Sequence, residues 1–311
     1  MIISIGMRTD IINYYTPWLL KRIEEEYAYS RNPYYPELVY KVSLKPEDID
    51  TMIMCSKNYR PILPYLPQIK KKYPLYCHYT ITAYDKDMEP FVPPIDESIN
   101  TLIELSTILG KKSIAWRYDP ILLTNKYTIE YHLKTFEYIC SKINNHIDRC
   151  IFSFVEMYPR FQTYLPDIIP LKDSDKIVLV KGLGVIAKKY GIHIQICGSN
   201  DDYTEYGVHR SGCVTLDILS KANNLNFKHL KHNGIRKGCH CIEQKSIGAY
   251  NTCLNGCRYC YANKKPYECR ANYKKHDPNS PLILGHIQQG DKIIEGKVNH
   301  YRLNNNQRLD V

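Results

Sequence analysis

The stretch Cys253-Leu-Asn-Gly-Cys257-Arg-Tyr-Cys260-Tyr-Ala-Asn263 carries three thiols at C-x3-C-x2-C spacing in a polar, turn-prone segment. Core packing does not require this spacing, because buried cysteines are interchangeable with other small apolar residues. A short loop that bends at Gly256 can aim three thiolates at one point, and cysteine thiolates are the usual ligands of iron–sulfur clusters. The stretch therefore predicts a [4Fe-4S] site held by Cys253, Cys257 and Cys260, with one iron open to a small molecule.

Zinc is the alternative metal for these thiols. Zinc sites are usually built from two close cysteine pairs or from cysteines with closely spaced histidines, whereas here the third cysteine is close and a fourth is not. The spacing, with the aromatic Tyr259 directly before the last cysteine, resembles the cluster motif of radical S-adenosylmethionine enzymes. The resemblance implies that S-adenosylmethionine would chelate the open iron.

Twelve cysteines are present, and they are unevenly distributed. Several lie in apolar runs and are expected to be buried in the core. Four others in the last 115 positions of the chain are predicted to form a second metal site, either zinc or a second iron–sulfur cluster. The alternatives are that one of the four completes the first cluster, or that they are ordinary cysteines. These four are Cys197, Cys213, Cys239 and Cys241.

Composition limits the class of protein. The chain has 311 residues, of which 44% are hydrophobic and 24% charged, as expected of a folded protein in water. We expect neither a membrane span nor a secretion signal, and hence a cytoplasmic protein whose thiols stay reduced. The formal charge of +10 allows a nucleic-acid partner, but the lysines are dispersed, and nucleic acid is not the favoured partner.

Residues 1–200 alternate strand-like and helix-like segments. Strands are expected at 2–5, 51–56, 75–83, 113–116, 150–155 and 192–196, with helices such as 16–29, 96–109, 128–144 and 173–190 between them. Such alternation implies parallel strands joined by right-handed crossovers. The prediction is an α/β fold, a partial or complete β/α (TIM-like) barrel over 1–200, with an open doubly wound sheet as the alternative. A cysteine-rich iron–sulfur segment, 201–275, would pack on the barrel mouth, and 276–311 would be a peripheral tail.

Polar residues follow the predicted strands. In β/α barrels the functional groups gather at the carboxyl ends of the strands, so these residues are candidates for catalysis. The alternative is that loops are polar and that neighbouring Arg and Asp residues are structural ion pairs. The candidates are Arg8, Asp10, Lys57, Arg117, Asp119 and Glu156.

Several motifs together are similar to the bacterial domain-of-unknown-function family DUF1848, over roughly residues 1–270. Its members end in a cysteine cluster similar to that of radical S-adenosylmethionine proteins. One departure is that Met7 precedes Arg8, where the family carries Arg-Arg-Thr-Asp. The motifs are Ile3-Ser-Ile-Gly-Met-Arg8-Thr9-Asp10-Ile11, Arg31-Asn32-Pro33, Ser56-Lys57-Asn58, Trp116-Arg117-Tyr118-Asp119-Pro120-Ile121-Leu122, Cys239-His-Cys241 and the stretch from Tyr250 to Asn263.

The functional hypothesis is a [4Fe-4S] redox enzyme, similar to radical S-adenosylmethionine enzymes, that takes electrons from a donor and acts on an unknown small molecule. Two features differ from that class. The cysteine motif stands late in the chain, and Ser56-Lys57-Asn58 occupies the position where a Gly-Gly-Glu-like stretch is expected. The alternatives are another iron–sulfur enzyme, an electron-transfer or sensing protein, and a zinc-stabilised nucleic-acid-binding module.

Overall fold

The main sheet of the computed structural model contains eight parallel strands in the spatial order β10-β1-β4-β5-β6-β7-β8-β9. The structure describes residues 1–159, 161–228, 238–263 and 265–303. The strands are β1 (Ile2–Ile5), β4 (Thr51–Ser56), β5 (Leu75–Thr80), β6 (Ile114–Ile121), β7 (Arg149–Phe154), β8 (His193–Ile196), β9 (His209–Arg210) and β10 (Lys245–Ser246).

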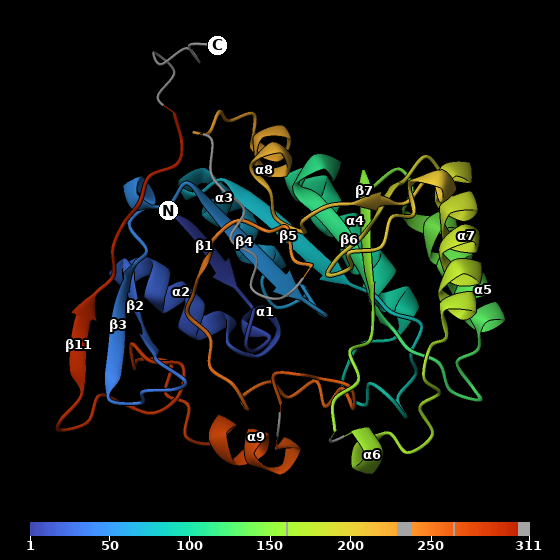
Figure 1. Ribbon diagram of the computed structural model, residues 1–311. Coiled ribbons are helices and arrows are strands. Elements are labelled where there is room, and N and C mark those ends of the chain that lie inside the picture. The colour runs from blue at the N-terminus through green and yellow to red at the C-terminus, as the bar shows by residue number, and fades with distance from the viewer. Residues whose placement is uncertain (160, 229–237, 264, 304–311) are drawn as a thin grey trace.

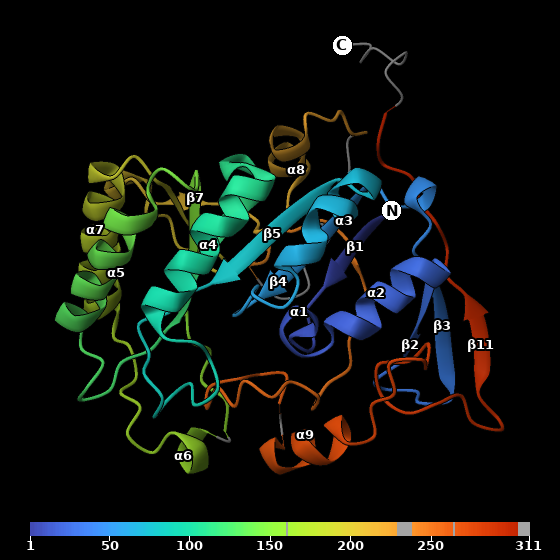
Figure 2. The same cartoon turned by 180° about the vertical axis from the view of Figure 1, so that it is seen from behind.

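Helices connect successive strands along one face of this sheet, as Figures 1 and 2 show. Their amphipathic sequences explain the arrangement. In α5, for example, the Thr128 side chain caps the first turn by accepting from Tyr131 N, and Phe136, Ile139 and Ile143 are buried toward the sheet. The connecting helices are α3 (Leu66–Lys72), α4 (Ile95–Leu109), α5 (Ile129–Ile143) and α7 (Asp173–Lys189), with α1 (Ile11–Tyr14) and α2 (Thr16–Glu25) after β1.

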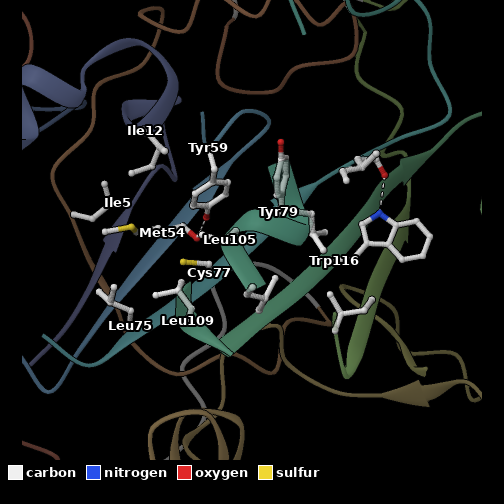
Figure 3. Packing of buried hydrophobic residues seen from close by; sticks show 14 of the residues in the cluster. Ile5, Ile12, Met54, Tyr59, Leu75, Cys77, Tyr79, Leu105, Leu109 and Trp116 are labelled. Atoms are coloured by element: carbon white, nitrogen blue, oxygen red, sulfur yellow. Dashed lines mark hydrogen bonds between the residues drawn. The ribbon is translucent and has the colours of Figure 1, made fainter. Parts of the chain in front are cut away.

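The face under the helices, here called the outer face, carries the main hydrophobic core. Met54, Cys77 and Trp116 belong to it, and Figure 3 shows them packed against Leu105 and Leu109 of α4. Trp116 Nε1 donates to Ile81 O at 2.9 Å, so the indole is satisfied within the core. This core accounts for the strongly apolar strands that the sequence predicted.

The opposite, inner face has a smaller apolar cluster and a polar region. Because successive residues of a strand face opposite sides, Ile53 and Ala115 point inward, and so do Cys55 and Arg117 two residues later. The apolar part packs against α8 (Leu216–Asn223), which Figure 1 shows beyond the amino ends of the strands. After Ile242 the chain joins the edge of the sheet as β10, which pairs with β1, and then continues toward the carboxyl ends of the strands (Figure 1).

A second sheet, of order β11-β3-β2, lies beside the first. Its strands are β2 (Tyr27–Arg31), β3 (Leu38–Ser43) and β11 (Lys292–Glu295), which pairs with β3 in parallel. The prediction of a helix over 16–29 was too long. The observed α2 ends at Glu25, because Glu26 takes a left-handed conformation with φ 62°. The remaining helices are α6 (Phe161–Tyr164) and α9 (Pro266–Tyr273).

The predicted α/β class and large parallel sheet are confirmed. The strand order ends at β10 and β9, and within the described residues no hydrogen-bonded ladder joins these two strands, so the complete barrel is not shown. Within the same part of the chain, no helix is long and apolar enough to cross a membrane.

Candidate functional site

Residues 253–260, here called the cysteine loop, lie against the carboxyl edge of the sheet, where β1, β4 and β5 end. Asn255 is the main attachment point and is 4% exposed. Its Nδ2 donates to Asp10 Oδ2 at 3.0 Å, its Oδ1 accepts from Tyr14 OH at 3.0 Å, and its carbonyl accepts from Phe91 N at 3.3 Å. Tyr261 OH, just after the loop, donates to Met7 O at 2.6 Å. Side chains from both ends of the sequence thus fix the loop.

The three thiols of the cysteine loop lie within electrostatic range of one another. Burial raises the pKa of Cys253 and of Cys257, and the Cys260 thiol raises both further. The backbone amides of Asn255 and Asp10 oppose this rise in the pKa of Cys253. Amides that do so favour the thiolate form, which is the form that binds metal.

Asp10 joins the cysteine loop to the sheet. Its carboxylate accepts from Ser56 Oγ at 2.6 Å and Lys57 N at 3.0 Å, and it caps α1 by accepting from Asn13 N at 3.1 Å. With Asn255 it therefore has four donors. Burial raises the pKa of Asp10, while these hydrogen bonds lower it. Asp10 is a positioning residue, since its oxygens are already occupied.

Lys57 lies beside the cysteine loop in a buried ion pair that was not predicted. Its Nζ lies 2.9 Å from Glu89 Oε1, and Glu89 also accepts from Thr82 Oγ1 at 2.7 Å and from Tyr259 OH. Burial alone would lower the pKa of Lys57, but the Glu89 carboxylate and then the Cys257 thiol raise it above its usual value. Glu89 was missed because it follows no strand. The only sequence signal for it is an acidic residue in an apolar, proline-rich connection.

Arg117 and Asp119 lie on the inner face of β6, within the strand and not after it as predicted. They form an ion pair, and Asp119 also accepts from Ser153 Oγ. Burial alone would lower the pKa of Arg117, but Asp119 and then Cys213 outweigh it and raise the pKa. Arg117 is therefore within electrostatic range of the second group of cysteines, whereas Asp119 also raises the pKa of Lys57 beside the cysteine loop.

Arg8 and Glu156 lie at the periphery. Arg8 Nη1 donates to Gly248 O at 3.3 Å, and its guanidinium lies 5.6 Å from the centroid of the Tyr250 ring. Arg8 therefore orients the chain leading into the cysteine loop. Glu156 is exposed on the loop after β7, where it accepts from Tyr158 OH at 2.7 Å.

The second group of cysteines gathers on the inner face. Cys213 Sγ lies 2.7 Å from Cys197 Sγ, Cys213 N donates to Cys241 Sγ at 3.2 Å, and the Cys197, Cys213 and Cys239 thiols raise the pKa of Cys241. All four predicted members are thus neighbours. In the described ranges, no group of three or more His, Cys, Asp or Glu side chains that could hold a metal ion is found.

Comparisons with known proteins identify a family without an assigned activity. No curated protein matched the sequence. Among solved structures, the chain is similar to a Bacteroides thetaiotaomicron protein described as a “putative alpha-L-fucosidase”, at 12% identity, with 74% of this chain and 85% of that chain covered and a TM-score of 0.25. A likeness at this level carries no argument about fold or function. A family model described as Domain of unknown function (DUF1848) matches residues 2–262. Because this match runs from β1 through the cysteine loop, the chain belongs to the DUF1848 family.

Proposed function

We propose that this protein is an iron–sulfur redox enzyme whose [4Fe-4S] cluster is held by Cys253, Cys257 and Cys260. The proposal includes a small-molecule substrate at the carboxyl edge of the sheet, as at the mouth of a partial β/α barrel. The observation that carries it is the position of the cysteine loop: Asn255 donates to Asp10 beside the ends of β1 and β4, and the Cys260 thiol raises the pKa of both Cys253 and Cys257. A cluster with three protein ligands keeps one iron for an external ligand, and S-adenosylmethionine is our candidate.

The donor set fits such a cluster. The ligands come from one short loop, and Gly256 at its bend has φ 70°, a conformation that favours glycine. The backbone amides of Asn255 and Asp10 lower the pKa of Cys253 against the effect of burial, and amides near the sulfur are one of the features that tune cluster ligands. Within the described chain, the buried Asn263 Oδ1 has no hydrogen-bond partner, while Asn263 Nδ2 donates to Cys253 O at 2.8 Å. A polar atom beside the loop is therefore left for a ligand or a water.

The surrounding residues supply charge balance and shielding. When bound, the cluster would supply one-electron transfer. Lys57 is held as a cation by Glu89, so a positive charge remains beside the Cys257 thiolate. Burial raises the pKa of Tyr259 well above its usual value, so its hydroxyl stays protonated and keeps donating to Glu89. The Lys57–Glu89–Tyr259 network thus fixes one side of the site and excludes water from it.

The nucleic-acid alternative rests on a different part of the molecule. A groove of about 330 Å³ lies at the amino edge of the sheet, and its lining includes Lys70, Lys71, Lys72 and Arg302. This groove would suit an anionic partner, but it lies at the other end of the strands from the cysteine loop. A salt titration of nucleic-acid binding tests it separately.

Metal analysis and electron paramagnetic resonance test the proposed function. Anaerobically purified protein should contain iron and acid-labile sulfide, give a signal on reduction with dithionite, and change that signal when S-adenosylmethionine is added. Replacing Cys257 by Ala should remove most of the iron. Cys269→Ser is the matched control, because Cys269 is a buried thiol in the neighbouring α9 whose sulfur lies 3.7 Å from Lys265 O. A colourless protein that contains zinc instead of iron at the cysteine loop would refute the proposal, and an unchanged signal would exclude S-adenosylmethionine.

A further inference from the structure

We propose that Cys197, Cys213, Cys239 and Cys241 form a second, closed site for one tetrahedral metal ion, of the class that takes zinc. This four-cysteine cluster is separate from the cysteine loop and does not depend on the proposed function. Its thiols come from three chain segments, namely the end of β8, the loop before α8 and the loop before β10. A closed set of four cysteine ligands is one of the usual donor sets of structural zinc sites, although only Cys239 and Cys241 form a close pair here.

The contacts within the cluster already converge on one point. Cys213 is the centre: its sulfur lies 2.7 Å from Cys197 Sγ, and its backbone N–H donates to Cys241 Sγ at 3.2 Å. The Cys197 thiol, and then the Cys213 and Cys239 thiols, raise the pKa of Cys241. These contacts thus join Cys197, Cys213 and Cys241, and electrostatics relates Cys239 to them.

The spacing favours one ion over a multinuclear cluster. Four sulfurs at about 2.3 Å from a tetrahedral zinc ion lie about 3.8 Å apart. The observed 2.7 Å between Cys213 Sγ and Cys197 Sγ is shorter than this, but longer than the ~2.05 Å of a disulfide. Insertion of an ion would separate the sulfurs by about 1 Å, whereas a cube of iron and sulfide would require much more room.

Glycines allow the three segments to approach one another closely. A Cβ on Gly212 would lie 2.4 Å from His240 O and 2.8 Å from Cys241 N. A Cβ on Gly238 would lie 3.2 Å from the carbonyl carbon of Gly198. The glycine beside Cys213 thus permits contact with the Cys241 segment, and the glycine before Cys239 permits contact with the segment after Cys197.

Side chains of the sheet hold the central loop from below. Gln195 Nε2 donates to Gly212 O at 2.9 Å, and His78 Nε2 lies 3.2 Å from Cys213 O. Both side chains are buried. Outer-shell hydrogen bonds of this kind fix the orientation of metal ligands. The loop that carries Cys213 is therefore rigid before any ion binds.

Burial and charge also suit a tetrathiolate. Cys197, Cys213 and Cys241 are each less than 9% exposed and lie in the apolar inner cluster with Ile218 of α8. Binding of Zn²⁺ would displace four thiol protons and leave a site with a net charge of −2. Arg117 lies within electrostatic range of Cys197 and Cys213 and offsets part of that charge.

Metal binding by the full-length chain tests this site apart from the first. In a background with Cys253, Cys257 and Cys260 all replaced by Ala, the protein should still bind one zinc ion per chain. Replacement of zinc by Co²⁺ should give the intense visible bands and thiolate charge transfer of a tetrahedral tetrathiolate. In the same background, Cys239→Ser should weaken Co²⁺ affinity by at least about 100-fold. Loss of a direct ligand should cost at least as much as the largest losses typical of outer-shell changes, which reach about 100-fold.

Two further variants distinguish a ligand from a merely structural cysteine. Cys239→His should keep a tetrahedral cobalt spectrum with weaker thiolate charge transfer. Cys55→Ser, at the nearby inner-face thiol outside the cluster, should leave the spectrum unchanged. Any of three results would overturn the site: no stoichiometric zinc or cobalt in the triple variant, a Cys239→His spectrum identical to that of its parent, or a Cys197–Cys213 disulfide in anaerobically isolated protein. Loss of iron from the cysteine loop would not change the zinc and cobalt binding expected of the four-cysteine cluster.

Discussion

At the scale of single residues, Glu89 determines the character of the site beside the cysteine loop. It is 2% exposed and accepts from Lys57, Thr82 and Tyr259. A buried carboxylate is stable only when its charge is matched and its oxygens are hydrogen-bonded, and here both conditions hold. Glu89 therefore ties β4, β5 and the cysteine loop together at one point.

Glu89→Gln should destabilise the protein strongly. The amide keeps the shape of the side chain but removes the charge that Lys57 faces, and the Lys57 side chain is only 11% exposed. Breaking a buried pair by neutralising one partner costs about 3–5 kcal/mol of the free energy of unfolding. Urea unfolding under reducing conditions measures this loss.

The matched control is Glu104→Gln, which breaks the pair between Arg60 Nη1 and Glu104 Oε2 at 2.7 Å. Both of those side chains are about half exposed, so solvent screens the pair and the loss should be below about 1 kcal/mol. Equal losses in the two variants would show that Glu89 has no special role in stability.

Gly256→Ala should lower the iron content of the purified protein. The residue has φ 70°, and an added Cβ would lie 2.8 Å from Pro90 Cγ. The left-handed conformation costs a residue with a side chain about 1–2 kcal/mol, so the turn between Cys253 and Cys257 should open. Iron per chain, measured after anaerobic purification, checks the expectation. Gly248→Ala is the control, because its Cβ would make only ordinary contacts, from 3.4 Å outward, and it should keep its iron.

Residue types and spacing revealed part of this site. Asp10 and Lys57 follow predicted strands, and the structure brings both beside the cysteine loop. Glu89 could not be found in this way, because its role depends on a long connection folding back over the sheet. Glu156 follows a strand equally well, yet it is exposed. Position after a strand therefore identifies the edge of the sheet but not which side chain turns into the site.

At the scale of elements, α5 shows how one buried histidine links packing to pH. His132 Nε2 lies 2.9 Å from Leu122 O, and its Nδ1 lies 3.0 Å from Tyr118 OH, so the ring joins α5 to β6 and the segment after it. Burial lowers the pKa of His132 to about 4, although the hydrogen bond to Leu122 O opposes this. The ring is therefore neutral in the folded protein at neutral pH.

The sign of the resulting pH dependence follows from the unfolded chain, where the pKa of histidine is near 6.5. Between pH 6.5 and pH 4 the unfolded state binds the extra proton, so stability is present above pH 6.5 and is lost as the pH falls. Over this window the free energy of unfolding should drop by about 3 kcal/mol more in the natural protein than in His132→Gln. Urea unfolding at several pH values measures the difference. His286→Gln, at an exposed histidine, should leave the slope unchanged, and a slope unaltered by His132→Gln would contradict the account.

Hydrophobic periodicity predicted the strands and helices of the main sheet well, since each helix buries one apolar stripe on the outer face. It failed where short elements depend on distant partners. The expected helix ran on to residue 29, where the chain instead forms β2 and pairs with β3. No strand was predicted at 292–295, where β11 pairs with β3 on its other side. The predicted strand ended at residue 116, but β6 extends to Ile121. Arg117 therefore lies within the strand, and its inward direction could not be predicted from the sequence.

At the scale of the whole molecule, the two faces of the main sheet are held by different means. The outer face has the extended apolar core beneath α3, α4, α5 and α7. The inner face has a smaller apolar cluster that includes Cys197, Cys213 and Cys241, and the same stretch of chain continues to the cysteine loop at the carboxyl edge. If both proposed metal sites are loaded, metal–thiolate bonds would fix this covering chain, here called the cover, over a scaffold, the main sheet and its outer helices, that packing stabilises.

Metal removal should consequently loosen the cover and leave the scaffold intact. Binding energy at a structural metal site is also folding energy for the segments that supply its ligands. After zinc is removed with a chelator under reducing conditions, the amides of Leu219 and Ile242 should exchange with solvent at least about tenfold faster. These amides now donate to Thr215 O and Val214 O, each at 3.1 Å. The amides of Met54 and Cys77, in the outer core, should keep their protection.

Hydrogen exchange read by mass spectrometry separates the two cysteine groups within one experiment. Replacing the three cysteines of the cysteine loop by Ala should expose residues 253–263 while leaving the exchange of Leu219 slow, because the four-cysteine cluster holds α8 independently. A uniform loss of protection across both faces after zinc removal would mean that the molecule unfolds as one unit. Unchanged exchange at Leu219 and Ile242 would mean that packing alone holds the cover, and the division between a packed scaffold and a metal-fixed cover would then be wrong.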